Sequence, residues 1–346
     1  MTELPSFLKD KPICVDEYGV AYSEDRKTLI YCPAEFKGEY IIPEGVTKID
    51  CEAFEECENL TGITLPDSLL NIDDCAFFGC TALKAIHLPE GLLSMGSTAF
   101  GNCSSLTSIN IPDSLMSFGN NGMPFLRCNS LPVIDGMRYA DTYLVETADK
   151  TRSSYTIKEG TRFIGDDAFG WTPDVEEIII PNSVISIENH AFFDCKKLKT
   201  IVIPDSVTRI GDNAFYGSGI ESITIPDSVT HIGALAFDQC YNLSSISIPE
   251  SVTYLGARAF GSCHSLTSVI IPNGVKHIGN LTFYDCENLQ SITLPESVTF
   301  IQDGRYEALL DCKKLKKIIV PKGHKQRFEI MLEFSINKLG FQIVEN

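Results

Sequence analysis

The sequence predicts a repeat solenoid, a superhelix of short stacked coils with a parallel β-sheet. The first observation is a motif that recurs about every 23 residues, most clearly at 204–215 and 226–237. The second is that apolar residues within one repeat follow neither a helical nor a simple strand period, so each repeat must turn more than once. The third is that one repeat cannot bury its own apolar side chains. Adjacent repeats must therefore stack to form a continuous core.

Eleven repeats are found when proline, or lysine in one case, is taken as position 1. The consensus is Pro-Asp-Ser-Val-Thr-x-Ile-Gly-x-x-Ala-Phe-x-x-Cys-x-x-Leu-x-x-Ile-x-Ile. The repeats begin at Pro43, Pro66, Pro89, Pro112, Lys158, Pro181, Pro204, Pro226, Pro249, Pro272 and Pro295.

Each part of the repeat predicts one element of a coil. The segment Leu-x-x-Ile-x-Ile, as in 243–248, predicts a short strand that ends at the next proline, because proline cannot donate to a β-ladder. Pro-Asp-Ser predicts a corner, and Ala-Phe-x-x-Cys predicts a single turn. Val-Thr-x-Ile-Gly predicts a second extended piece. Its glycine suits a residue with positive φ; these glycines are Gly165, Gly211, Gly233, Gly256 and Gly279.

Two stretches interrupt the repeat and resemble each other. Residues 16–45 and 135–160 each alternate apolar residues around a central turn, which predicts a β-hairpin before a fresh run of coils. Insertions precede Cys128 and Cys312, and the helical spacing of residues 323–334 predicts a capping helix. The predicted organisation is an N-terminal segment with a β-hairpin cap (1–42), four repeats (43–132), a hairpin insertion (133–157), seven repeats (158–320) and a C-terminal cap (321–346). Whether the two runs form one continuous superhelix is left open.

The repeats resemble the BspA type of leucine-rich repeat, also called the Treponema pallidum type. The likeness covers about residues 13–334 and rests on Ala-Phe-x-x-Cys-x-x-Leu, which recurs nearly unchanged. The resemblance implies a right-handed leucine-rich-repeat superhelix with a parallel sheet on its concave side, short turns or 3-10 pieces between the strands, and a role like that of bacterial surface adhesins that bind host or matrix proteins. It implies no catalytic or binding residue, because the motif fixes none.

The composition is acidic, with a formal net charge of -18. Such a charge argues against binding nucleic acid or an anionic membrane through the body of the protein. Residues 313–327 are locally basic, which suggests either an anion-binding patch or, as we favour, a solubilising end. The first eleven residues lack the apolar core of a signal peptide, which predicts a cytoplasmic chain as written, or a surface or secreted one if a signal has been removed. The sequence does not predict the oligomeric state.

Nine of the thirteen cysteines occupy position 15 of the repeat, between phenylalanine and leucine. We expect them to be buried free thiols rather than disulfides, because the total is odd and Ser218 and Thr172 replace cysteine at this position. No paired Cys-x-x-Cys motif indicates zinc, and we expect neither metal nor cofactor. The nine are Cys57, Cys80, Cys103, Cys128, Cys195, Cys240, Cys263, Cys286 and Cys312.

Position 6 of the second run carries the most distinctive side chains of the sequence. Coils stacked in register would align them as an exposed ladder, which could bind a protein or a sugar, or could simply stabilise itself by stacking. Its histidines could make binding depend on pH. We call this set the ladder; it consists of Arg209, His231, Tyr254, His277 and Phe300. The first run has Lys48, Asn71, Ser94 and Ser117 instead.

Other surfaces offer weaker signals. Positions 20 and 22 should form a smooth outward face of mostly small residues on the concave strands. Acidic residues at position 2 could bind calcium, although the Pro-Asp-Ser turn already explains them. Trp171, the only tryptophan, is either an exposed anchor or a cap between the two runs.

No catalytic motif is present, so the sequence predicts a protein that is not an enzyme. We expect a leucine-rich-repeat module that binds another protein. The alternatives are a structural spacer or scaffold and, with less support, a glycan-binding protein.

Overall fold

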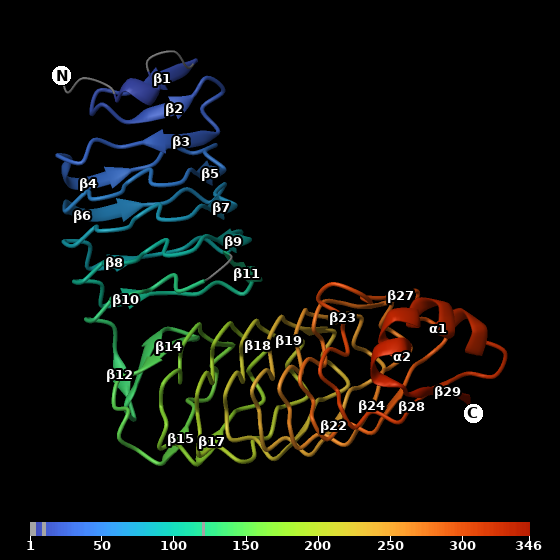
Figure 1. Cartoon of the computed structure of the whole chain (residues 1–346). Coiled ribbons are helices and arrows are strands. Elements are labelled where there is room, and N and C mark those ends of the chain that lie inside the picture. The colour runs from blue at the N-terminus through green and yellow to red at the C-terminus, as the bar shows by residue number, and fades with distance from the viewer. Residues whose placement is uncertain (1–4, 9–11, 120–121) are drawn as a thin grey trace. The chain divides into compact units, whose positions relative to one another are not determined.

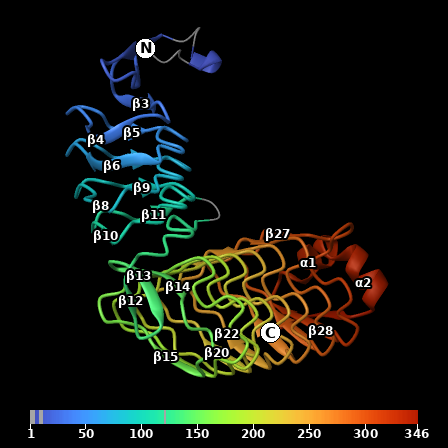
Figure 2. The ribbon, with the colours of Figure 1, turned by 90° about the vertical axis from the view of Figure 1, so that its left-hand side faces the viewer.

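The computed structural model describes residues 5–8, 12–119 and 122–346. The chain forms two compact units, Met1–Val145 and Glu146–Asn346, each of which is a stack of coils (Figures 1 and 2). The expectations for the start of the chain and for the insertion before Cys128 involve residues 1–4, 9–11 and 120–121, which lie outside the described residues. The predicted repeat solenoid is confirmed.

In the first unit, every full coil contributes a short strand at positions 6 and 7 and a second strand around position 20. We call these two sets the position-6 row and the position-20 row. The position-6 row pairs in parallel and consists of β5 (Lys48–Ile49), β7 (Asn71–Ile72), β9 (Ser94–Met95) and β11 (Ser117–Phe118). The position-20 row consists of β4 (Lys37–Ile41), paired with β6 (Asn59–Thr64), and β8 (Ala85–Ile86), paired with β10 (Ser108–Ile109).

The second unit repeats this arrangement, except that segment 200–203 forms no strand, and its two rows lie on opposite sides of the stack (Figure 1). Its position-6 row consists of β16 (Phe163–Ile164), β18 (Ser186–Ile187), β19 (Arg209–Ile210), β21 (His231–Ile232), β23 (Tyr254–Leu255), β25 (His277–Ile278) and β27 (Phe300–Ile301). Its position-20 row consists of β15 (Ser154–Thr156), β17 (Glu177–Ile179), β20 (Ser222–Thr224), β22 (Ser245–Ser247), β24 (Ser268–Ile270), β26 (Ser291–Thr293) and β28 (Lys317–Val320).

The turn Ala-Phe-x-x-Cys closes the third side of each coil and bonds to the next coil. The backbone N–H groups of positions 10, 12 and 14 donate to the carbonyls of positions 9, 11 and 13 in the following coil, as Asn213, Phe215 and Gly217 do. Positions 10 and 14 have positive φ, which lets alternate N–H groups point the same way along the stack. The serine of Pro-Asp-Ser adds a link at the corner, since Ser206 Oγ donates to the Val184 carbonyl at 2.6 Å.

The core of each unit is a column of stacked phenylalanine rings from position 12. Neighbouring ring centroids lie 5.0–6.1 Å apart in the first unit, and 5.0–5.8 Å apart in the second. The first column contains Phe54, Phe77, Phe100 and Phe125, and the second contains Phe169, Phe192, Phe215, Phe237, Phe260 and Phe283.

The nine cysteines at position 15 are buried free thiols, as predicted. They are more than apolar fillers, because eight of them donate S–H to the carbonyl of the phenylalanine in the preceding coil at 3.0–3.2 Å. Burial raises the pKa of Cys195, Cys240 and Cys312 to about 12. These thiols are therefore protonated donors at neutral pH.

Antiparallel pairing occurs in both stretches where hairpins were predicted. The first unit begins with η1 (Ser6–Leu8), and then β1 (Ile13–Val15), β2 (Ala21–Ser23) and β3 (Thr28–Tyr31) pair antiparallel before β3 joins β5 in parallel. Later, β12 (Val133–Ile134) pairs antiparallel with β13 (Met137–Ala140). The division between the units falls within the next strand, β14 (Tyr143–Thr147).

The C-terminal cap contains two helices and a strand, where one helix was expected. Helix α1 (Lys325–Met331) buries Phe328 and is followed by α2 (Glu333–Leu339) and by β29 (Gln342–Glu345), which pairs with β28. The Asp303 carboxylate accepts the N–H groups of Phe334 and Ser335 at 2.8 and 3.1 Å. The insertion before Cys312 thus anchors the cap.

One local expectation is wrong. The position-8 glycines Gly211, Gly233, Gly256 and Gly279 do not have positive φ; the left-handed residues lie two positions later, for example at Leu235. Both predicted extended pieces form parallel ladders, and the longer ladders run along the position-6 row. Neither helix in the described part of the chain is long and apolar enough to cross a membrane.

Candidate functional site

The structure aligns most of the predicted ladder in register. Arg209 lies opposite His231, and His231 lies opposite Tyr254, on three successive paired strands of the position-6 row. His277 lies opposite Phe300 on the pair β25–β27. Strands β23 and β25 contact each other but belong to different sheets, so the ladder consists of a group of three and a group of two.

Ring contacts join four of the ladder side chains in two pairs. His231 stacks on Tyr254 with centroids 4.3 Å apart and planes within 5°, and His277 meets Phe300 edge to face at 6.2 Å. Tyr254 and Phe300 nevertheless keep about half of their surface exposed, at 50% and 49%. The ladder therefore stabilises itself by stacking and also presents apolar ring surface to solvent.

His231 is neutral at physiological pH. Partial burial and the adjacent Arg209 guanidinium lower the pKa of His231 to about 4, because both disfavour the imidazolium form. We therefore expect His231 to become charged only when the pH falls to about 4, well below the usual histidine pKa of about 6.5.

We expect the stability of the second unit to fall as pH decreases from about 6.5 to about 4 because of His231. The unfolded chain binds a proton at the histidine in this range and the folded chain does not, so acid favours unfolding. The expected contribution is about 1–2 kcal/mol after allowance for solvent screening. His231→Tyr keeps a stacking ring and removes the titration. Urea unfolding at pH 7 and pH 4.5 should show a smaller acid loss for this variant than for the unchanged protein, and equal losses would contradict the assignment.

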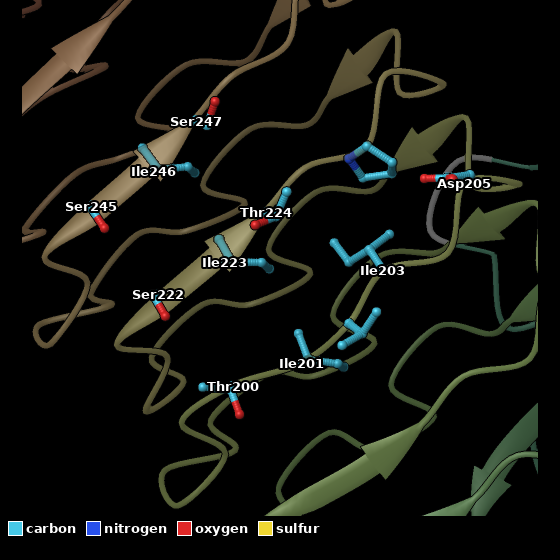
Figure 3. A pocket seen from close by; sticks show the side chains of 12 residues that line it. Thr200, Ile201, Ile203, Asp205, Ser222, Ile223, Thr224, Ser245, Ile246 and Ser247 are labelled. Carbon is cyan, nitrogen blue, oxygen red and sulfur yellow. The ribbon is translucent and has the colours of Figure 1, made fainter.

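The position-20 row of the second unit contains a hollow of about 630 Å³ (Figure 3). Segment 200–203 is not part of a β-strand, although it occupies the place of one between β17 and β20. Segment 200–203, β20 and β22 follow one another along the hollow, and Ile201, Ile223 and Ile246 line it together with serine and threonine side chains. Val202, at position 22 of this segment, is 82% exposed, in line with the outward direction expected for this position.

A further aromatic group lies on the turn side of the second unit and was not recognised in the sequence. Trp171 is 61% exposed, and its ring lies 4.9 Å from that of Phe193. Phe193 in turn stacks on Tyr216 at 4.8 Å. Trp171 occupies position 14 of its repeat, and Phe193 and Tyr216 occupy position 13 of the next two repeats. An alignment of the repeats would therefore have placed these three rings next to one another. Trp171 is thus an exposed residue of the first coils of the second run.

The remaining charged candidates have structural roles where the structure gives them partners. At one acidic corner, Glu250 accepts the backbone N–H of Asn273 at 2.9 Å. In the basic segment, Arg327 donates to the carbonyls of Glu296 and Val298, and Lys314 donates to Asn288. Within the described ranges, no three histidine, cysteine or acidic side chains gather as a metal site would require.

Comparison with known proteins identifies the repeat. A family model described as a BspA type leucine-rich repeat region matches residues 35–139, 162–280 and 253–339, in six copies. No curated protein matches the sequence.

Several solved structures are similar to this chain. A leucine-rich repeat protein from Bacteroides ovatus is 27% identical, covers 97% of this chain and 90% of its own, and has a TM-score of 0.45. The pneumococcal vaccine antigen PcpA is 15% identical over 96% of this chain and 98% of its own, with a TM-score of 0.42. The leucine-rich repeat protein of Treponema pallidum is 23% identical over 76% of this chain and 90% of its own, with a TM-score of 0.30.

Proposed function

Because the chain belongs to the BspA type leucine-rich repeat family, we propose that it is a non-enzymatic module that binds a protein partner through the ladder. The observation that carries the proposal is the alignment of exposed rings on successive coils of one row. Arg209, His231 and Tyr254 lie side by side on paired strands, and His277 and Phe300 continue the row.

The composition of the ladder fits a protein interface. Tyrosine and arginine are enriched among residues that dominate binding energy, and they act when neighbouring contacts exclude water from them. Tyr254 is anchored on one face by His231 and still half exposed, so a partner can bury it without ordering a free side chain first. The side chains are also spread along the stack and not gathered around one point, which suits recognition of an extended surface.

A glycan is a less suitable ligand for this row. Sugars pack on the faces of aromatic rings. The rings of His231 and Tyr254 stack with their planes within 5° of parallel, so each ring covers one face of the other. The other alternative, a spacer or scaffold, would require no partner at the ladder. By the family resemblance, the proposed partner is a host or matrix protein met at the cell surface.

Photo-crosslinking in the native host tests the proposal. A photoreactive phenylalanine analogue in place of Tyr254 should capture one major protein, whereas the same analogue in place of Val202, exposed on the position-20 row, should not. The captured protein, once purified, should bind the Tyr254→Ser/His277→Ser variant at least about tenfold more weakly. Serine occupies the same position at Ser94 and Ser117, so the variant suits the fold.

Three results would argue against the ladder. Capture at neither site favours the spacer, and unchanged affinity of the double variant removes the ladder as the site. Capture only at Val202 would move the interface to the position-20 row. Protease treatment of intact cells, with a cytosolic protein as control, would separately test display at the surface.

A further inference from the structure

The first unit presents an apolar stripe that the second unit lacks. At position 5, which points outward, Leu70, Leu93 and Met116 are 38%, 51% and 69% exposed. Backbone hydrogen bonds hold them in successive coils, since Leu93 N–H donates to the Leu70 carbonyl and Met116 N–H donates to the Leu93 carbonyl. The second unit has threonine at this position in four repeats: Thr208, Thr230, Thr253 and Thr299. The repeat therefore accepts a polar residue here, and the core does not require the apolar stripe.

A hollow of about 260 Å³ adjoins the stripe, since its lining residues Ser94 and Ser117 follow Leu93 and Met116 directly in the chain. It occupies positions 6–9 of the same coils, where Ser94 and Ser117 take the place of the rings of the second unit. Gly96 and Gly119 form part of its lining, and a Cβ atom at either glycine would lie within 2.4 Å of a backbone nitrogen of the preceding coil. The same row is thus a ridge of rings in the second unit and a depression in the first.

Carboxylates line one wall of this hollow. Asp73 and Asp74 belong to its lining, and Asp50 lies one coil before Asp73. Lys48 pairs with Asp50 and Asp73 at 3.2 and 2.7 Å, so one cation is shared by two of these three carboxylates. Asp74 is exposed and accepts the Ser97 N–H at 2.6 Å. The wall retains a net negative charge beside an apolar stripe.

We propose that the stripe and this hollow form a second docking surface, which binds a basic amphipathic helix of a partner protein. The apolar side chains of the helix cover Leu70, Leu93 and Met116, and its lysine or arginine side chains face Asp73 and Asp74. This surface lies in the first unit and is independent of the ladder.

The spacing of the stripe selects a helix over an extended peptide. Stacked coils repeat at about 4.8 Å. Apolar residues on one face of a helix recur with each turn, at about 5.4 Å, whereas those on one face of a strand recur at about 6.8 Å. Over the two steps from Leu70 to Met116, a helix goes out of register by about 1.2 Å and a strand by about 4 Å. Methionine is flexible and adapts to the smaller mismatch.

Cys51 supplies a local probe, because it is exposed and lines the hollow. The probe ligand is a short synthetic peptide of leucine and lysine patterned as an amphipathic helix. We expect it to slow alkylation of Cys51 at least about fivefold while leaving Cys14, elsewhere in the same unit, unchanged. We also expect the bound peptide to gain helical circular dichroism. Peptides with serine in place of leucine, or glutamate in place of lysine, should not protect Cys51.

The variant Leu70→Thr/Leu93→Thr/Met116→Thr uses the residue that the second unit has at this position, so it should fold normally. We expect it to weaken binding of the leucine-lysine peptide about tenfold or more. The control is Ile330→Thr, which replaces an apolar residue of the C-terminal cap that is 71% exposed and should leave binding unchanged. Unchanged affinity of the triple variant would overturn the proposal. So would protection of Cys51 by the serine-lysine peptide, which would indicate charge attraction alone. A peptide bound without gain of helix would also overturn it, and so would a dimer that the triple variant abolishes, since a second copy would then be the occupant.

Discussion

Replacing Phe237 with alanine should lower the free energy of unfolding of the second unit by about 3–5 kcal/mol. The ring has no exposed surface and stacks between Phe215 at 5.2 Å and Phe260 at 5.5 Å. Its removal leaves a cavity in the centre of the column, and the coils on either side cannot close it because their backbones are bonded to one another at the turn.

Urea unfolding followed by circular dichroism measures this loss. A solenoid need not unfold in one step, so hydrogen exchange in residues 226–260 should show where the loss occurs. Phe300→Ala is the control, because that ring is half exposed and lies outside the column. If both variants unfolded at the same urea concentration, the column would not be the source of stability that its geometry indicates.

The repeat period predicts the core well because burial has to recur with it. Phenylalanine recurs at position 12 and cysteine at position 15 of nearly every coil, as at Phe237 and Cys240. Once either position is assigned as inward, the assignment holds for the whole column. The in-register placement of Arg209, His231 and Tyr254 follows for the same reason. What the ladder binds is a property of a partner's surface, and the repeat carries no information about it.

The sequence predicts the surface between the strands less well. Position 5 is exposed between the buried residues at positions 4 and 7, whereas simple alternation would place Leu93 on the same side as buried Met95. The hollow beside segment 200–203 lies where no strand forms, although Ile201 and Ile203 keep the apolar pattern of the repeat. The second cap helix begins at a contact with Asp303, about thirty residues earlier in the chain, which helical periodicity does not reveal.

The sequence correctly indicates that position 8 favours glycine, but the reason that we expected is wrong. The actual reason leads to the second large expected effect. We expected these glycines to adopt positive φ, but at Gly211, Gly233 and Gly256 the structure instead shows close approach of the preceding coil. A Cβ atom on Gly256 would lie 2.2 Å from the backbone nitrogen of Ala234 and 2.4 Å from the carbonyl carbon of Gly233. A backbone cannot rotate away as a side chain can, so the two coils would have to separate.

Gly256→Ala should therefore destabilise the second unit by about 3 kcal/mol, and Gly279→Ala supplies the matched comparison. Gly279 occupies the same position of the next repeat, but the nearest atom to its added Cβ would be the Ala257 Cα at 4.0 Å, an ordinary contact. Since φ at Gly279 is also not positive, alanine should be neutral there or stabilise by about 0.4–1 kcal/mol by restricting the unfolded chain. Urea unfolding of both variants measures the difference. Equal destabilisation would show that position 8 needs the freedom of glycine after all, whereas a large effect at Gly256 alone would establish that coil-to-coil contact, and not local conformation, places glycine in this repeat.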